Sequence, residues 1–121
     1  MSNYPEAFDL LMAAWNEPNP NKTRSYLDKA LTPNVRFVDP SIDIIGIDEF
    51  EKNIHDVRAK NPGTRFSRAS KVDSQHGFFR YHWSIHNAEG KLVMPGFDVD
   101  EIDEQERVKC VIGFFGELDR D

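Results

Sequence analysis

Apolar residues recur at helical spacing in the first part of the chain. One stripe has i, i+3, i+4, i+7 spacing and consists of Phe8, Leu11, Met12 and Trp15. It predicts a first helix, which Ser2 and Asn3 can cap and which Pro18 ends. A second helix, capped by Asn21 and ending before Pro33, has an apolar side made of Tyr26, Leu27, Ala30 and Leu31.

The next segment changes from strand to helix. Residues 35–38 are a short β-rich run that ends at Asp39, because Pro40 favours an extended conformation in the residue before it. Asp48 and Glu51 then have the spacing of a helix-capping pair. The apolar positions of this third helix, which ends near residue 61, are Ile47, Phe50, Ile54 and Val57.

Four long β-rich segments follow, at residues 64–72, 78–87, 91–102 and 107–118. Short polar turns separate them, so we expect neighbouring strands to pair in an antiparallel meander. Helices in the first half and strands in the second predict segregated α+β packing rather than alternating βαβ units. A chain of 121 residues has room for one hydrophobic core, so residues 1–121 are expected to form a single domain.

Composition narrows the class of partner. The formal net charge is −6 and no basic cluster is present, which argues against nucleic acid and anionic membranes as partners. Cys110 is the single cysteine and cannot form an internal disulfide. The sequence shows no signal-peptide core and no apolar run of membrane-spanning length, so we expect a cytoplasmic protein.

Three motifs add a family resemblance: Ala14-Trp15-Asn16, the stretch 31–40 that ends in Asp39-Pro40, and residues 111–116 with the sequence VIGFFG. Together with the order of elements, they resemble the nuclear-transport-factor-two-like superfamily, particularly its SnoaL-like polyketide cyclase branch. The resemblance implies a cone-shaped, curved antiparallel sheet, with three helices from the N-terminal half covering its concave face in a cystatin-like roll. The superfamily includes isomerases, cyclases, epoxide hydrolases and non-catalytic binding modules, so the fold alone does not select a function.

The same resemblance implies roles for two aspartates. Asp39 matches the general base of ketosteroid isomerases, and Asp98 falls where SnoaL-like cyclases place their acid/base aspartate. In an apolar cavity, desolvation raises the pKa of a carboxyl into the range useful for proton transfer next to a carbonyl. The alternative is structural, because Asp39 can accept backbone N–H bonds in its turn and Asp98 can pair with an arginine or face solvent.

The tyrosine that donates to the oxyanion in ketosteroid isomerases would fall near Leu11, where this chain has no hydroxyl. Tyr26 or Tyr81 could replace it from elsewhere. An epoxide hydrolase of the related type would need an Asp-Arg-Asp group, which requires Arg80 on the same face as Asp98.

His82 is a third catalytic candidate, because an imidazole can transfer protons near neutral pH. It shares one face of its strand with Arg80, Ser84 and His86, but alternation does not decide whether that face meets the pocket or the surface. His82 and His86 would lie about 13 Å apart, too far to bind one metal ion directly. We expect no metal site and no cofactor.

The expected pocket wall consists of Trp15, Tyr26, Phe37, Phe50, Val111, Gly113 and Phe115. Such a wall suits a small apolar or cyclic molecule. The other sheet face carries Cys110, Ile112 and Phe114, a strip that predicts a homodimer. The leading hypothesis is a cofactor-independent cyclase or isomerase acting on a cyclic or polyketide-like carbonyl compound. The alternative is a non-catalytic ligand-binding or dimerisation module.

Overall fold

The computed structural model describes residues 4–119, which form three helices and seven strands. The helices are α1 (Glu6–Asn16), α2 (Pro20–Ala30) and α3 (Ile47–Lys60). The strands are β1 (Leu31–Asp39), β2 (Ile42–Ile45), β3 (Arg65–Arg68), β4 (Asp73–Gln75), β5 (Phe78–His86), β6 (Leu92–Ile102) and β7 (Val108–Phe115). No helix in this part of the chain is long and apolar enough to cross a membrane.

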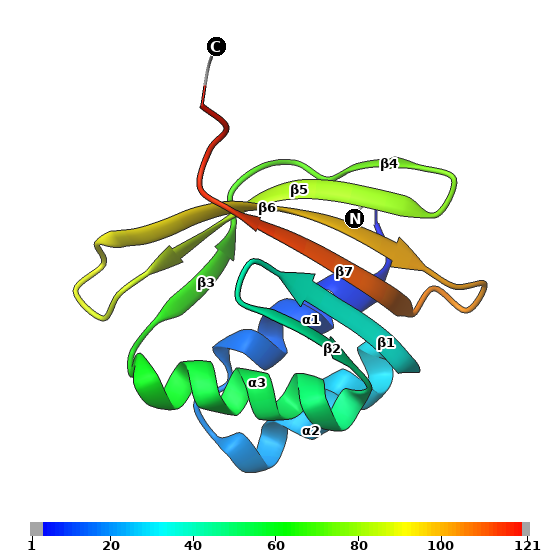
Figure 1. The fold of residues 1–121 in the computed structure, drawn as a ribbon. Coiled ribbons are helices and arrows are strands. Elements are labelled where there is room, and N and C mark those ends of the chain that lie inside the picture. The colour runs from blue at the N-terminus through cyan, green and yellow to red at the C-terminus, as the bar shows by residue number, and fades with distance from the viewer. Residues whose placement is uncertain (1–3, 120–121) are drawn as a thin grey trace.

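The strands form one curved sheet in the order β2-β1-β7-β6-β5-β3, with β4 paired to β5. Figure 1 shows this sheet arching over the three helices, so the predicted α+β fold is confirmed. The β5-β6-β7 meander is antiparallel, as expected, but β1 and β7 run parallel and make the sheet mixed. This pairing needs no hairpin, because most of the chain lies between the two strands.

Several local expectations shift. Asn19 rather than Asn21 caps α2, since its side chain accepts from the Asn21 N–H at 2.9 Å and Pro20 occupies the first helical position. Residues 64–72 form only the short strand β3, and the hairpin strand β2 was not predicted. The expected cap at Ser2 and Asn3 lies outside the described residues.

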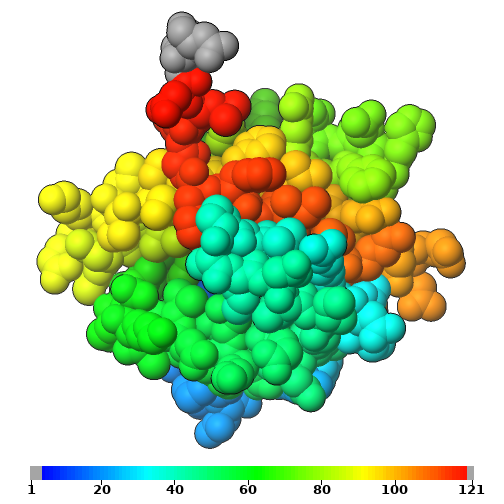
Figure 2. Space-filling model, in the orientation of Figure 1, coloured from blue at the N-terminus to red at the C-terminus, as the bar shows by residue number. Residues whose placement is uncertain are grey.

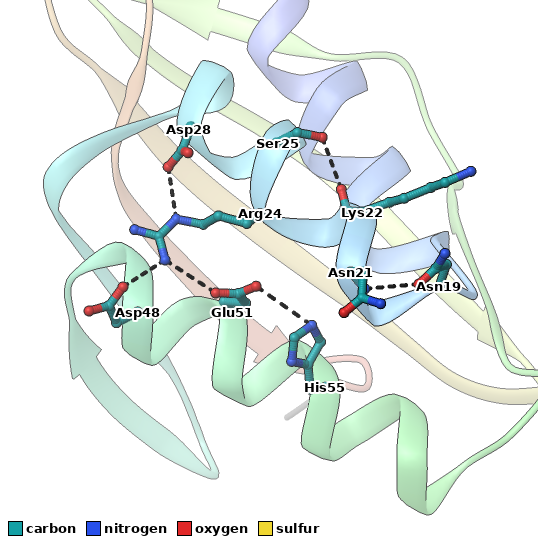
Figure 3. Close-up of polar contacts among 9 residues, drawn as sticks. All are labelled: Asn19, Asn21, Lys22, Arg24, Ser25, Asp28, Asp48, Glu51 and His55. Carbon is teal, nitrogen blue, oxygen red and sulfur yellow. Dashed lines mark hydrogen bonds and ion pairs between the residues drawn. The ribbon is translucent and has the colours of Figure 1, made fainter.

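An arginine on the surface joins α2 to the start of α3. Arg24 Nε lies 2.8 Å from Asp28 Oδ1, and its Nη1 lies 2.7 Å from Asp48 Oδ1 and 3.2 Å from Glu51 Oε1 (Figure 3). Glu51 therefore bonds across the helix pair instead of capping α3, and no side chain caps that helix. Because Arg24, Asp28 and Asp48 are exposed, the cluster adds little stability.

The core lies between the helices and the concave face of the sheet. Its fully buried side chains include Leu27, Leu31, Val35, Phe50, Ile54 and Val108. At the C-terminal end, the chain leaves the body of the molecule after β7, and Figure 2 shows this last segment in red projecting from the surface. Leu118 in this segment is 98% exposed. The core is therefore complete without the C-terminal segment.

Candidate active site

A pocket of about 160 Å³ opens between the concave face of the sheet and the helices α1 and α3. Its walls are mostly apolar, with Phe8, Leu11, Met12 and Trp15 from α1, Val57 from α3, and Phe37, Phe66, Ile85, Val111 and Phe115 from the sheet. Its polar lining consists of Asp39, Ser41, Asn53, Tyr81, Trp83 and Asp98. A few polar groups in an apolar cavity are the usual composition of a small-molecule site.

Strand register brings the central polar group together. Tyr81 on β5 lies directly opposite Asp98 on β6, and Asp98 lies opposite Gly113 on β7. Directly opposed residues point to the same face of a sheet, so the two side chains meet under the helices. Tyr81 Oη lies 3.2 Å from Asp98 Oδ2.

A glycine brings Trp83 to the same aspartate. Gly96 lies opposite Trp83, and a Cβ placed there would lie 1.9 Å from the indole Cζ2 atom. The indole therefore lies directly over Gly96 and reaches the next inward-facing residue of β6, which is Asp98. There Trp83 Nε1 donates to Asp98 Oδ1 at 2.7 Å.

The environment of Asp98 changes its proton affinity. The pKa of this carboxyl is raised to about 7, and desolvation is the main cause. The hydrogen bonds from Trp83 and Tyr81 oppose this rise, and the nearby charge of Asp39 adds to it. No arginine or lysine forms an ion pair with it within residues 4–119. Asp98 can therefore take up or release a proton close to neutral pH.

Asp39 lines the pocket, where Gly113 separates it from Asp98. A Cβ on Gly113 would lie 3.4 Å from Asp39 Cβ and 3.1 Å from Asp98 Oδ1, so the missing side chain keeps this space open. Asp39 Oδ1 also accepts from the backbone N–H of Ser41 at 2.8 Å and from its hydroxyl at 2.7 Å. Asp39 thus makes the backbone contact expected for a structural role in its turn, and it also lines the pocket.

His82 lies on the outer face of the sheet, away from both aspartates. It alternates with Tyr81 and Trp83, which line the pocket, and its exposed ring packs against Phe97 at a centroid distance of 5.1 Å. Arg80 shares this face and pairs with Asp73 at 2.8 Å. The structure therefore removes His82 from the pocket and forms no Asp-Arg-Asp group with Arg80.

Two expected wall residues lie elsewhere. Phe50 is fully buried behind Phe37, with ring centroids 4.9 Å apart, and Tyr26 donates from its hydroxyl to Glu17 Oε1 at 3.2 Å. Both belong to the helix packing rather than to the pocket. The expected wall residues that do line it are Trp15, Phe37, Val111, Gly113 and Phe115.

Sequence reasoning missed four polar residues of this region. Trp83, Asn53 and Ser41 line the pocket, and Asp100 lies buried beside Tyr81. The alternation that set His82 apart also places Trp83 on the face of Tyr81, and Asp100 follows Asp98 by two residues on the same strand. Asn53 gave no comparable signal. No group of three histidine, cysteine, aspartate or glutamate side chains able to hold a metal occurs in the described chain.

This chain was compared with known proteins by sequence and by structure, and the two comparisons gave different results. No protein-family model matches this sequence. No curated protein matches it either. Among solved structures, a SnoaL-like polyketide cyclase candidate from Jannaschia sp. CCS1 has a TM-score of 0.70 at 12% identity, over 91% of this chain and 85% of that one. A nuclear-transport-factor-two-like protein of unknown function from Exiguobacterium sp. 255-15 has a TM-score of 0.74 at 15% identity, over 93% and 99%. Both show the fold alone.

A third structure is similar in sequence as well. It is a candidate isomerase of the SnoaL-like family from Agrobacterium tumefaciens, with a TM-score of 0.86 and 31% identity. The match covers 92% of this chain and 95% of that one. The chain therefore belongs to the SnoaL-like family.

Proposed function

We propose that this protein is a cofactor-independent isomerase or cyclase that uses Asp98 as its general acid/base on a small cyclic carbonyl compound. The observation that carries the proposal is the position of Asp98, which lines an apolar pocket with a pKa of about 7. A group that transfers protons in both directions works best when its pKa lies near the operating pH. The names of the similar structures, isomerase and polyketide cyclase, fit this class of reaction.

The proposed step is proton transfer at the carbon next to a carbonyl. Ionised Asp98 takes the proton and the substrate becomes an enolate. In an isomerisation, Asp98 returns the proton to another carbon of the enolate. In a cyclisation, the enolate carbon attacks a second carbonyl of the same molecule, and Asp98 gives the proton to the resulting alkoxide. Either reaction ends with Asp98 ionised again.

An enolate oxygen needs a hydrogen-bond donor. Asn53 on α3 belongs to the pocket lining, and its side-chain amide carries N–H donors. We assign it to the substrate carbonyl oxygen. The role of Asp39 would be electrostatic, because its negative charge helps to keep the pKa of Asp98 high.

Pocket size limits the substrate. A closed cavity of about 150 Å³ in another protein holds one benzene molecule. The volume here is about 160 Å³, so one ring fits inside. A longer molecule would have to extend through the mouth, where Phe115 is 40% exposed. We therefore favour single-ring ketones, enones and phenols.

The test is calorimetric binding of a panel of single-ring ketones, enones and phenols, with polycyclic ketones as the oversized comparison. We expect the wild type to bind single-ring members and Asp98→Asn to change their affinity about tenfold or more. Asp56→Asn, at an exposed position, is the matched control. Equal binding by wild type and Asp98→Asn, or no binding of any member, would contradict the proposal.

We also propose a second copy of the chain as a partner at the outer sheet face. Register places Val38 beside Ile112 and Phe97 beside Phe114, which joins outward apolar residues of β1, β7 and β6. Phe114 is 53% exposed. The Lys109–Glu101 ion pair lies at the β6-β7 end of this patch. A continuous apolar patch with charges at its edge is typical of a protein interface.

A further inference from the structure

Asp100 lies beneath the pocket and takes no part in the reaction proposed above. It is fully buried on β6, where its cross-strand neighbours are the buried residues Phe79 and Val111. Asp100 Oδ2 lies 3.0 Å from Tyr81 Oη, and its Oδ1 has no hydrogen-bond partner. A buried carboxylate with one neutral partner would be strongly disfavoured.

The number of hydrogens available to Tyr81 points to a proton on one of the two carboxyl groups. Tyr81 Oη is within hydrogen-bond distance of both Asp98 and Asp100, at 3.2 and 3.0 Å, but a neutral hydroxyl has one hydrogen to donate. The second contact is a hydrogen bond only if the carboxyl on that side donates to the tyrosine oxygen. The two carboxyl groups and Tyr81 therefore hold two protons when both bonds are formed.

Geometry assigns the second proton to Asp100. Asp98 accepts from the Trp83 N–H and lines the pocket, so its charge has a donor besides Tyr81 and faces the open cavity. Asp100 has neither. The ionisable groups near it are Asp98, Tyr81 and the thiol of Cys110, and none carries a positive charge. Burial and the Asp98 charge also raise the pKa of Asp100 well above its ordinary value, and burial does the same for Tyr81.

We infer that Asp100 is a positioning residue held as a neutral carboxylic acid, which donates to Tyr81 and directs the Tyr81 hydroxyl onto Asp98. Asp98 is then the ionised member of the pair and starts the reaction as the base. In the reverse arrangement Asp98 would hold the proton and could not accept one from a substrate. The catalytic part of this inference rests on the proposed function of Asp98, whereas the protonation of Asp100 does not.

The test is carbon NMR of the native protein labelled with ¹³C at the aspartate carboxyl carbons, recorded through a pH titration. Asp98→Asn and Asp100→Asn assign the two resonances. We expect the Asp100 signal to keep the shift of a protonated acid about one pH unit beyond the Asp98 midpoint, which lies near 7. An Asp100 signal at the carboxylate position while Asp98 is still protonated would overturn the inference.

Variants test the positioning role by the sign of a shift. Asp100→Asn keeps a donor to Tyr81 and adds no charge change, so the midpoint of Asp98 should move by less than about 0.5 pH unit. If Asp100 were ionised, the same substitution would lower that midpoint by about one unit or more. Tyr81→Phe removes a donor from Asp98 and should raise its midpoint by about one unit.

These readouts need no substrate. If Asp100 is protonated but the protein turns over no ketone, the inference about Asp100 stands and only the proposed function fails. If the protein is active but Asp100 is ionised, the proposed function stands and the inference about Asp100 fails.

Discussion

Asp98 should make the stability of this protein depend on pH in an unusual direction. Its pKa is about 7 in the folded protein, whereas an ordinary aspartate has a pKa of 3.8. Between these two pH values the folded state therefore binds more protons than the unfolded state. The contribution of Asp98 to the free energy of unfolding is therefore fully favourable below about pH 4 and declines as the pH rises to about 7.

Asp98→Asn removes the cost of burying an ionised carboxylate, which the wild type bears at high pH. We expect the variant to gain about 1–3 kcal/mol over the wild type at pH 8 and little at pH 4. Urea unfolding of both proteins at the two pH values measures the difference, which cancels the shared titration of surface groups. A gain that is the same at pH 4 and pH 8 would contradict the raised pKa.

Gly113 is the second residue on which the pocket depends. Gly113→Ala would place a methyl group 3.1 Å from Asp98 Oδ1, in the space between the two aspartates. We expect ligand affinity to fall about tenfold while the fold is kept. Ser84→Ala, on the outer face of β5, is a control that should bind normally. Calorimetry on both variants decides, and unchanged affinity in Gly113→Ala would show that ligands do not use this space.

The resemblance found the two aspartates from sequence, but not their partners. Asp98 and Asp39 were placed by motif, and both line the pocket. The contact between Trp83 and Asp98 depends on which residue of β5 lies opposite Gly96. Register is set by pairing across the sheet, and alternation within one strand cannot supply it. For the same reason, the sequence did not show on which face of the sheet His82 lies.

Among the elements, β5 and β6 act as a unit through Trp83 and Gly96. A Cβ at position 96 would lie within 1.9 Å of the indole, so Gly96→Ala should displace Trp83 and cost about 2–4 kcal/mol of stability. The displaced indole no longer donates to Asp98, which should raise the pKa of that carboxyl. Trp83→Phe is the matched variant that removes the donor and keeps most of the packing.

Urea unfolding and the Asp98 titration separate the two effects. Gly96→Ala should lose stability and raise the midpoint of Asp98, whereas Trp83→Phe should mainly raise the midpoint. If Gly96→Ala leaves both the stability and the Asp98 midpoint unchanged, the indole does not lie over Gly96 as described.

Long, strongly patterned elements were predictable, and short ones were not. The three helices and the strands β5, β6 and β7 follow from apolar periodicity. β2 has four residues and pairs in a hairpin after Asp39, too short to show a pattern of its own. The parallel contact between β1 and β7 joins distant parts of the sequence, so local signals do not contain it.

At the scale of the whole molecule, the outer sheet face predicts self-association. We expect sedimentation to show a dimer for the wild type and a monomer for Phe114→Glu, because the charge would lie within the apolar patch. Leu118→Glu, at a fully solvated position beyond the sheet, should leave the dimer intact. A wild type that stays monomeric at high micromolar concentration would contradict this prediction.

The most direct test of the central claim is hydrogen exchange on the substrate itself. Single-ring ketones are incubated with the protein in D₂O, and NMR follows loss of the protons next to the carbonyl. The wild type should accelerate this loss, and Asp98→Asn should reduce the acceleration about 10²–10⁴-fold while Asp56→Asn does not. Exchange that is equally fast with wild type and Asp98→Asn, or no faster than in buffer alone, would contradict the account.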